Sequence, residues 1–126
     1  PIEMRLQQSP YIDQCMVVGQ DQKALGVLVV PALEAFRQNG YIPASHAELA
    51  EDPKVKTIIG HEIRKLVSVP GGFKQYELIK DFRLLDRGFR VGDELTNLFK
   101  VKRHVVSKAF QDDIHKLFLN GNGKKL

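Results

Sequence analysis

Cysteine is almost missing from this 126-residue chain, which also has no tryptophan and no long hydrophobic run. One cysteine, Cys15, excludes an internal disulfide and is typical of a reducing compartment; within its hydrophobic stretch we expect it to be buried and inert. No apolar run approaches the roughly 20 residues that cross a bilayer, and no signal-peptide pattern is present, so we expect a soluble domain. The four histidines include no pair at metal-ligand spacing, which argues against a zinc site.

The charge balance is modestly basic, with 19 Lys and Arg against 15 Asp and Glu and a net charge of +4. This charge suits nucleotide and cofactor phosphates, nucleic acid or an acidic membrane surface equally well, so it selects none of them. The length and the 43% of hydrophobic residues indicate one globular domain with an adequate core. Because the chain begins at Pro1 and its first methionine, Met4, already lies in an amphipathic pattern, we interpret it as a segment of a longer polypeptide.

The first third of the chain predicts a short helix followed by two strands. The helix is expected over Ile2–Gln8 and ends before Pro10, since proline restricts its predecessor and has no backbone N–H to donate. Residues 13–19 and 25–31 are runs of β-forming residues with a polar turn between them, which indicates an antiparallel hairpin. The second run is more continuously apolar and predicts a strand buried on both faces.

Helices are then expected at three places. Leu33–Asn39 is followed by Gly40 as a C-terminal cap, and Ser45 with Glu48 three residues later matches a capping box. Asp52 followed by proline offers a further helix start, and the apolar residues after it recur on one face while cations occupy much of the other. We interpret this last helix as packing on a sheet rather than lying on a membrane.

A proline and two glycines at residues 70–72 form the strongest break in the chain. We do not interpret them as a phosphate-binding loop, because no strand, glycine loop and helix follow one another there. The run behind them predicts a third strand through Ile79, Phe82 and Leu84, and residues 86–93 a loop or a short strand pair. Together these elements predict an α+β domain with a small, mainly antiparallel three-stranded sheet flanked by helices.

Lys100, Lys102 and Arg103 place three cations within four residues, directly before the last helical pattern. From His104 onward, apolar residues at three- and four-residue steps predict one long helix, the longest of the molecule, with Lys100 on a loop at its start. A helix N-terminus carries partial positive charge, so three cations placed there repel it and one another. Binding of a phosphate or carboxylate from outside would relieve this repulsion. From charge alone, a solvated basic turn remains the favoured alternative. The apolar positions of the helix predicted from His104 onward are Val105, Val106, Ala109, Phe110, Ile114, Leu117 and Phe118.

The stretch Leu95–Arg103, followed by a helix, resembles the last motif of the adenylate-forming enzymes. Long-chain acyl-coenzyme A synthetases carry it as Leu-Thr-Pro-Thr-Leu-Lys-Leu-Lys-Arg, and the motif's first lysine, which enters the active site during adenylation, corresponds to Lys100. Residues 97–99 are Asn, Leu and Phe where the family has Pro, Thr and Leu. Stretches at residues 1–31 and 72–85 resemble the carboxy-terminal domain of the same enzymes, in the same order. There the Pro-x-Glu element, here residues 1–3, follows the hinge about which the domain rotates.

The resemblance implies that residues 1–119 are the C-terminal lid domain of a long-chain fatty acid–CoA ligase, with residues 120–126 as a flexible tail. It implies that Lys100 is the catalytic lysine of adenylation, and that Lys102 and Arg103 bind phosphate or orient the loop. The implied cofactors of the full-length enzyme are ATP, coenzyme A and Mg²⁺. We expect the fragment alone to bind none of them and to be inactive.

The implied partners are the N-terminal adenylation domain of the same chain and the substrates fatty acid, ATP and coenzyme A. No nucleic-acid partner is expected. A cytoplasmic location is expected, with peripheral membrane contact of the full-length protein left open. The acyl chain length cannot be read, because in this family the acyl pocket belongs to the larger domain.

The competing interpretation is a small basic α+β module that binds nucleic acid or acidic lipid through Lys100, Lys102, Arg103, Lys108 and the C-terminal lysines. Such a module needs exposed aromatic platforms or a groove that tracks the ligand. The phenylalanines do not favour it, because they are expected to lie in the core: Phe82, Phe89, Phe110 and Phe118. A purely regulatory interaction domain is a third possibility and leaves no distinctive sequence pattern.

Overall fold

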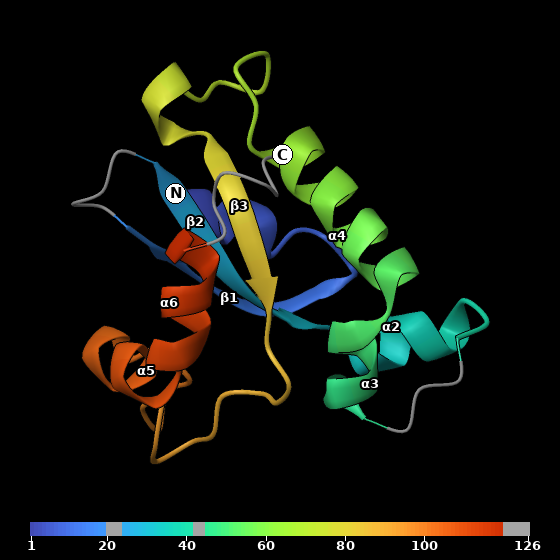
Figure 1. Cartoon of the computed structure of the whole chain (residues 1–126), viewed down its shortest axis with the longest axis vertical. Coiled ribbons are helices and arrows are strands. Elements are labelled where there is room, and N and C mark those ends of the chain that lie inside the picture. Colours follow the sequence, from blue (N-terminus) through green and yellow to red (C-terminus); the bar gives the residue numbers. More distant parts are fainter. Residues whose placement is uncertain (20–23, 42–44, 120–126) are drawn as a thin grey trace.

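A three-stranded sheet forms the centre of the molecule in a computed structural model that describes residues 1–19, 24–41 and 45–119. The strands are β1 (Ile12–Val18), β2 (Leu25–Pro31) and β3 (Ile79–Leu84), with β2 in the middle (Figure 1). β1 pairs with β2 in antiparallel orientation, as the predicted hairpin requires, and β2 pairs with β3 in parallel. The parallel pair follows from the helical crossover between β2 and β3 in the chain. The predicted α+β class is confirmed.

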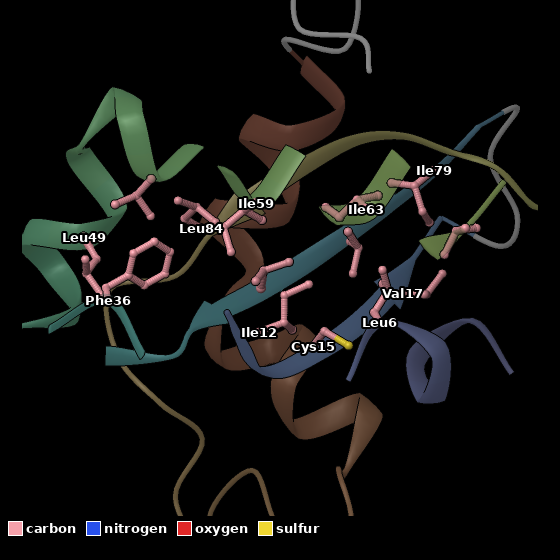
Figure 2. Packing of buried hydrophobic residues seen from close by; sticks show 14 residues of the cluster. Leu6, Ile12, Cys15, Val17, Phe36, Leu49, Ile59, Ile63, Ile79 and Leu84 are labelled. Carbon is pink, nitrogen blue, oxygen red and sulfur yellow. The ribbon is translucent and has the colours of Figure 1, made fainter. Parts of the chain in front are cut away.

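Apolar layers cover both faces of the sheet, which explains why β2 is buried on both sides. Val27 and Val29 face one layer, built with α1 (Ile2–Leu6), α2 (Leu33–Gln38), α3 (His46–Glu51) and α4 (Pro53–Leu66) (Figure 2). Leu28 and Val30 face the other, built with α5 (Arg103–Ala109) and α6 (Gln111–Leu119). Figure 1 shows α4 and α6 on opposite sides of β3. Successive side chains of one strand therefore belong to two separate cores.

Local capping signals fix the helix starts as predicted. The Ser45 hydroxyl accepts a hydrogen bond from the Glu48 N–H, and the Asp52 carboxylate accepts one from the Lys54 N–H at 2.8 Å, with Pro53 in the first turn. A short 3₁₀ helix, η1 (Gln75–Glu77), precedes β3. The predicted turn at 20–23, residues 42–44 and the tail at 120–126 lie outside the described residues.

The prediction of one long helix after Lys100 is wrong, and α4, with 14 residues, is longer than either piece that replaces it. α5 ends at Ala109, and its C-cap residue Phe110 has φ of −114° and ψ of 30°, which are not helical. Its buried ring packs against Phe89, with ring centres 5.8 Å apart. Backbone hydrogen bonds from Phe110 to Val106 and from Ile114 to Phe110 bridge the break, so the apolar period continues through it. Periodicity therefore could not reveal the break.

Cys15 is 2% exposed, as predicted, and burial raises the pKa of its thiol to about 12. The negative charge of Glu3 adds to this rise in the pKa. The thiol is therefore almost entirely protonated at neutral pH, which makes it a poor nucleophile. In the part of the chain that the structure describes, no helix is both long and apolar enough to cross a membrane.

The contact between α6 and β2 is close enough to require glycine at position 26. A Cβ built on Gly26 would lie 2.6 Å from Cδ2 of the buried Leu117. We expect Gly26→Ala to lower the free energy of unfolding by about 1–3 kcal/mol, measured by urea denaturation, because the tightly packed leucine must shift. Gly88→Ala is the control, since its Cβ would come no closer than 3.4 Å to another side chain. Equal destabilisation by both variants would contradict this account.

Candidate active-site loop

Lys100 follows a tight three-residue loop, residues 97–99, in the segment that extends past the end of β3 (Figure 1). The Thr96 N–H donates to the Lys100 carbonyl, and the Phe99 N–H donates to the Thr96 carbonyl, each at 2.8 Å. The Thr96 hydroxyl accepts from the N–H groups of Leu98 and Lys100 at 3.3 and 3.1 Å. This pattern is a three-residue hairpin, whose third residue takes the left-handed conformation. Phe99 occupies that position, with φ at 62°.

The hairpin projects its side chains away from the protein. Lys100 is exposed, and Leu98 and Phe99 are 77% and 72% exposed. Phe89 and Phe110 are buried, as expected, and Phe82 and Phe118 are partly buried against the two cores. The predicted position of Lys100, on a loop just before a helix, is confirmed, since α5 begins three residues later.

A buried carboxylate holds the base of this hairpin. Glu94 is 3% exposed, and its two oxygens accept two hydrogen bonds from the Arg87 guanidinium at 3.1 and 2.9 Å. The Arg90 N–H donates to the same carboxylate at 2.9 Å, and the Glu94 backbone carbonyl accepts from the Lys102 N–H at 2.7 Å. Glu94 thereby connects the segment before the hairpin, through Arg87 and Arg90, with the residues after it, through Lys102. These bonds, those from Arg87 above all, hold the pKa of Glu94 down at about 2.

Arg87 in turn connects the ion pair to the hydrophobic core. Its guanidinium lies 4.6 Å from the centre of the Phe110 ring, at the end of α5. A guanidinium can stack on an aromatic face and still donate in its own plane, so Arg87 serves both contacts. The loop is thus fixed to the layer formed by α5 and α6.

Arg103 is turned toward the first helix. Its guanidinium donates to the Glu3 carboxylate at 2.6 Å and to the Val17 carbonyl at 3.2 Å. The other oxygen of Glu3 accepts from the Val17 N–H at 2.7 Å. Lys102 is the N-cap residue of α5, and its contact with Glu94 is made by its backbone. Of the three predicted cations, Lys100 and Lys102 thus have no ion pair among the described residues, whereas Arg103 has Glu3.

Sequence reasoning missed Glu94 and Arg87 altogether, and it noted Glu3 only as part of the Pro-x-Glu element. The first two lie in an irregular segment, where no periodic pattern marks a buried polar residue. Arg103 and Glu3 lie 100 residues apart, so no local signal could pair them. Across the described ranges, no cluster of His, Cys, Asp and Glu could hold a metal ion.

The low pKa of Glu94 predicts a pH-dependent contribution to stability. Because this pKa lies below the ordinary value of 4.5, the contribution is present above pH 4.5 and is lost as pH falls toward 2. We expect Glu94→Gln to lower the free energy of unfolding by about 3 kcal/mol at pH 7, with the difference from wild type shrinking between about pH 5 and pH 2. Urea denaturation at several pH values measures it. The exposed neighbour Asp93, changed to Asn, is the control, and a pH-independent difference would refute the assignment.

The left-handed backbone at Phe99 predicts a stabilising substitution. A phenylalanine at positive φ is strained, and its exposed ring gains little from burial. We therefore expect Phe99→Asn to raise the free energy of unfolding by about 0.5–1 kcal/mol in the same denaturation assay. Leu98→Asn is the matched control, since it removes an equally exposed side chain at a position without positive φ. Stabilisation by both variants would point to loss of surface hydrophobicity instead of relief of strain.

Comparisons with known proteins agree with the resemblance in the sequence. Residues 1–57 match the family model described as AMP-binding enzyme C-terminal domain. The chain is 32% identical over 123 residues to the long-chain-fatty-acid–CoA ligase FadD15 of Mycobacterium tuberculosis, covering 93% of this chain and 20% of that protein. The chain thus spans about a fifth of the length of the curated relatives it matches.

Two solved structures share the fold. The adenylation domain of a carboxylate reductase from Mycobacterium chelonae aligns with a TM-score of 0.73 and 21% identity, over 94% of this chain and 17% of that one. The A-PCP didomain of the carboxylic acid reductase from Segniliparus rugosus, in complex with AMP, aligns with a TM-score of 0.72 and 23% identity, over 94% of this chain and 15% of that one. In sequence, the chain is similar to the C-terminal domain of AMP-binding enzymes over residues 1–57 and to a long-chain-fatty-acid–CoA ligase over nearly its whole length, and it shares the fold of these carboxylate reductase domains.

Proposed function

We propose that this chain is the mobile C-terminal domain of a long-chain fatty acid–CoA ligase, and that Lys100 is its adenylation lysine. The observation that carries the proposal is an exposed lysine on a hairpin anchored by the buried Glu94, in a chain 32% identical to a fatty acid–CoA ligase. An anchored hairpin with an exposed ammonium group suits a residue that must reach a site on another domain.

The proposed chemistry explains why a lysine is needed. Adenylation joins a fatty acid carboxylate to the α-phosphate of ATP and expels pyrophosphate, so two anions must approach each other. The ammonium group of Lys100 is a compact charge on a flexible stem, which can hydrogen-bond a carboxylate oxygen and a phosphate oxygen together. There it would stabilise the negative charge that develops in the transition state.

We place the binding sites for ATP, Mg²⁺ and fatty acid on the N-terminal adenylation domain of the full-length protein. By itself, this chain is then a lid without turnover. In the second half-reaction the coenzyme A thiol attacks the acyl carbon of the acyl-adenylate, forming the thioester and releasing AMP, a step that does not need the adenylation lysine. Rotation of the whole lid between the two steps would withdraw Lys100 and let one site run both reactions.

Substitution of Lys100 separates the two half-reactions in the full-length enzyme. We expect Lys100→Ala to lower fatty-acid-dependent ATP–pyrophosphate exchange by about 100-fold or more, because a charge stabilising the transition state is lost. Transfer of the acyl group from a supplied acyl-adenylate to coenzyme A should stay within about twofold, since Lys100 is withdrawn in that step.

Lys108→Ala is the matched control, because this lysine is also exposed and lies in the last turn of α5. We expect it to leave both half-reactions unchanged. Undiminished exchange in Lys100→Ala would end the assignment of Lys100, and equal loss of both half-reactions would show that the substitution damages the domain itself.

A further inference from the structure

Three residues from distant parts of the chain form a clasp at the edge of the sheet. Glu3 lies in α1, Val17 in β1, and Arg103 at the start of α5. One Glu3 oxygen accepts from the Val17 N–H at 2.7 Å, and the other accepts from the Arg103 guanidinium at 2.6 Å. The Arg103 guanidinium also donates to the Val17 carbonyl at 3.2 Å, so each of the three residues contacts the other two. We refer to Glu3, Val17 and Arg103 as the edge clasp.

The edge clasp positions the Arg103 side chain more than it stabilises the folded domain. The side chains of Arg103 and Glu3 are 53% and 28% exposed, and ion pairs with this much exposure contribute little to stability. Its three hydrogen bonds nevertheless set the position of the guanidinium relative to the backbone of β1. Removing the clasp should therefore change where the start of α5 lies without unfolding the domain.

Both partners of Arg103 belong to rigid parts of the fold. Val17 lies in a strand that pairs with β2 along its length. α1 is held on α4 by Arg5, whose guanidinium donates to the Leu66 carbonyl at 3.2 Å. The turn after α1 is held there too, because the Ser9 hydroxyl donates to the buried Glu62 carboxylate at 2.6 Å. Arg103 is thus fastened to the body of the domain and not to another loop.

Lys100 lies three residues before Arg103, so the clasp fixes one end of the segment that carries the lysine. Glu94 fixes the other end through its ion pair with Arg87. The two anchors attach the segment to different parts of the fold. Through Arg87, Glu94 attaches it to Phe110 in the core beside α5. The clasp attaches it to α1, the first helix in the chain. In a C-terminal domain, the rest of the enzyme joins ahead of this first element.

We infer that Glu3 and Arg103 are positioning residues that set the placement of Lys100 relative to the rest of the enzyme, an inference that rests on the proposed function. Arg103 then acts through Lys100 and does not bind nucleotide phosphate itself. If the clasp positions the lysine, losing either side chain should slow the step that uses Lys100 and spare the step that does not.

The test uses the full-length enzyme with Glu3→Gln, Arg103→Gln and the double variant. We expect each single variant to lower kcat of fatty-acid-dependent ATP–pyrophosphate exchange by about 10- to 100-fold, because small displacements of a catalytic group are costly. KM for ATP and coenzyme A transfer from a supplied acyl-adenylate should stay within about twofold. The double variant should be no slower than the worse single one, since both remove the same connection.

Arg37→Gln is the matched control, because it breaks an exposed ion pair of 2.7 Å with Glu34 in α2, remote from the clasp in sequence. It should leave exchange unchanged. A rise in KM for ATP in Arg103→Gln that Glu3→Gln does not reproduce would overturn the inference and make Arg103 a phosphate ligand. Equal loss of both half-reactions with a lower melting temperature would also overturn it, by showing a merely structural role.

The proposed function and this inference fail in different ways. Undiminished exchange in Lys100→Ala removes the function on which the clasp depends. Loss of exchange in Lys100→Ala, together with normal exchange in the clasp variants, removes only the positioning role of Glu3 and Arg103.

Discussion

A carboxylate buried in an irregular segment must find donors for both of its oxygens, and in this protein that requirement organises the region around Lys100. The Glu94 carboxylate accepts two hydrogen bonds from Arg87 and one from the Arg90 N–H, and the Glu94 backbone carbonyl accepts one from the Lys102 N–H. Leaving this buried charge without its partners would cost about 3–5 kcal/mol. The segment between β3 and α5 therefore has a defined geometry, although it contains no regular strand or helix.

The sheet divides the molecule into two halves with separate cores. α1 to α4 pack on one face, and α5, α6 and the Lys100 hairpin belong to the other. At the free edge of β1, however, Glu3 and Arg103 meet directly. The edge clasp is thus a polar connection between the half that begins the domain and the half that presents the lysine.

Features determined by neighbouring residues could be predicted from the sequence. Ser45 and Asp52 cap the helices that they were expected to start, and the runs on either side of residues 20–23 form the expected hairpin. The fold class and the position of Lys100 before a helix follow from such local patterns. The break at Phe110 was hidden, because it depends on how that ring packs on Phe89 and leaves the apolar period intact.

The partners of Glu94 and Arg103 were also hidden, because they are set by tertiary contacts across irregular or distant sequence. Local charge patterning could place three cations together but could not say which of them already had a partner. From the sequence, Arg103 was expected to bind phosphate or to orient the loop, and in the structure its guanidinium contacts Glu3 and Val17.

The position of Val17 at the outer strand of the sheet has one more consequence. Open strand edges invite pairing with the same strand of another molecule, which leads to aggregation. In β1 the Val17 N–H and carbonyl are both already occupied, by a carboxylate and a guanidinium that are too bulky and too polar to admit a foreign strand. The two side chains that fasten α5 to α1 thereby also help to keep one copy of the domain from adding to the sheet of the next.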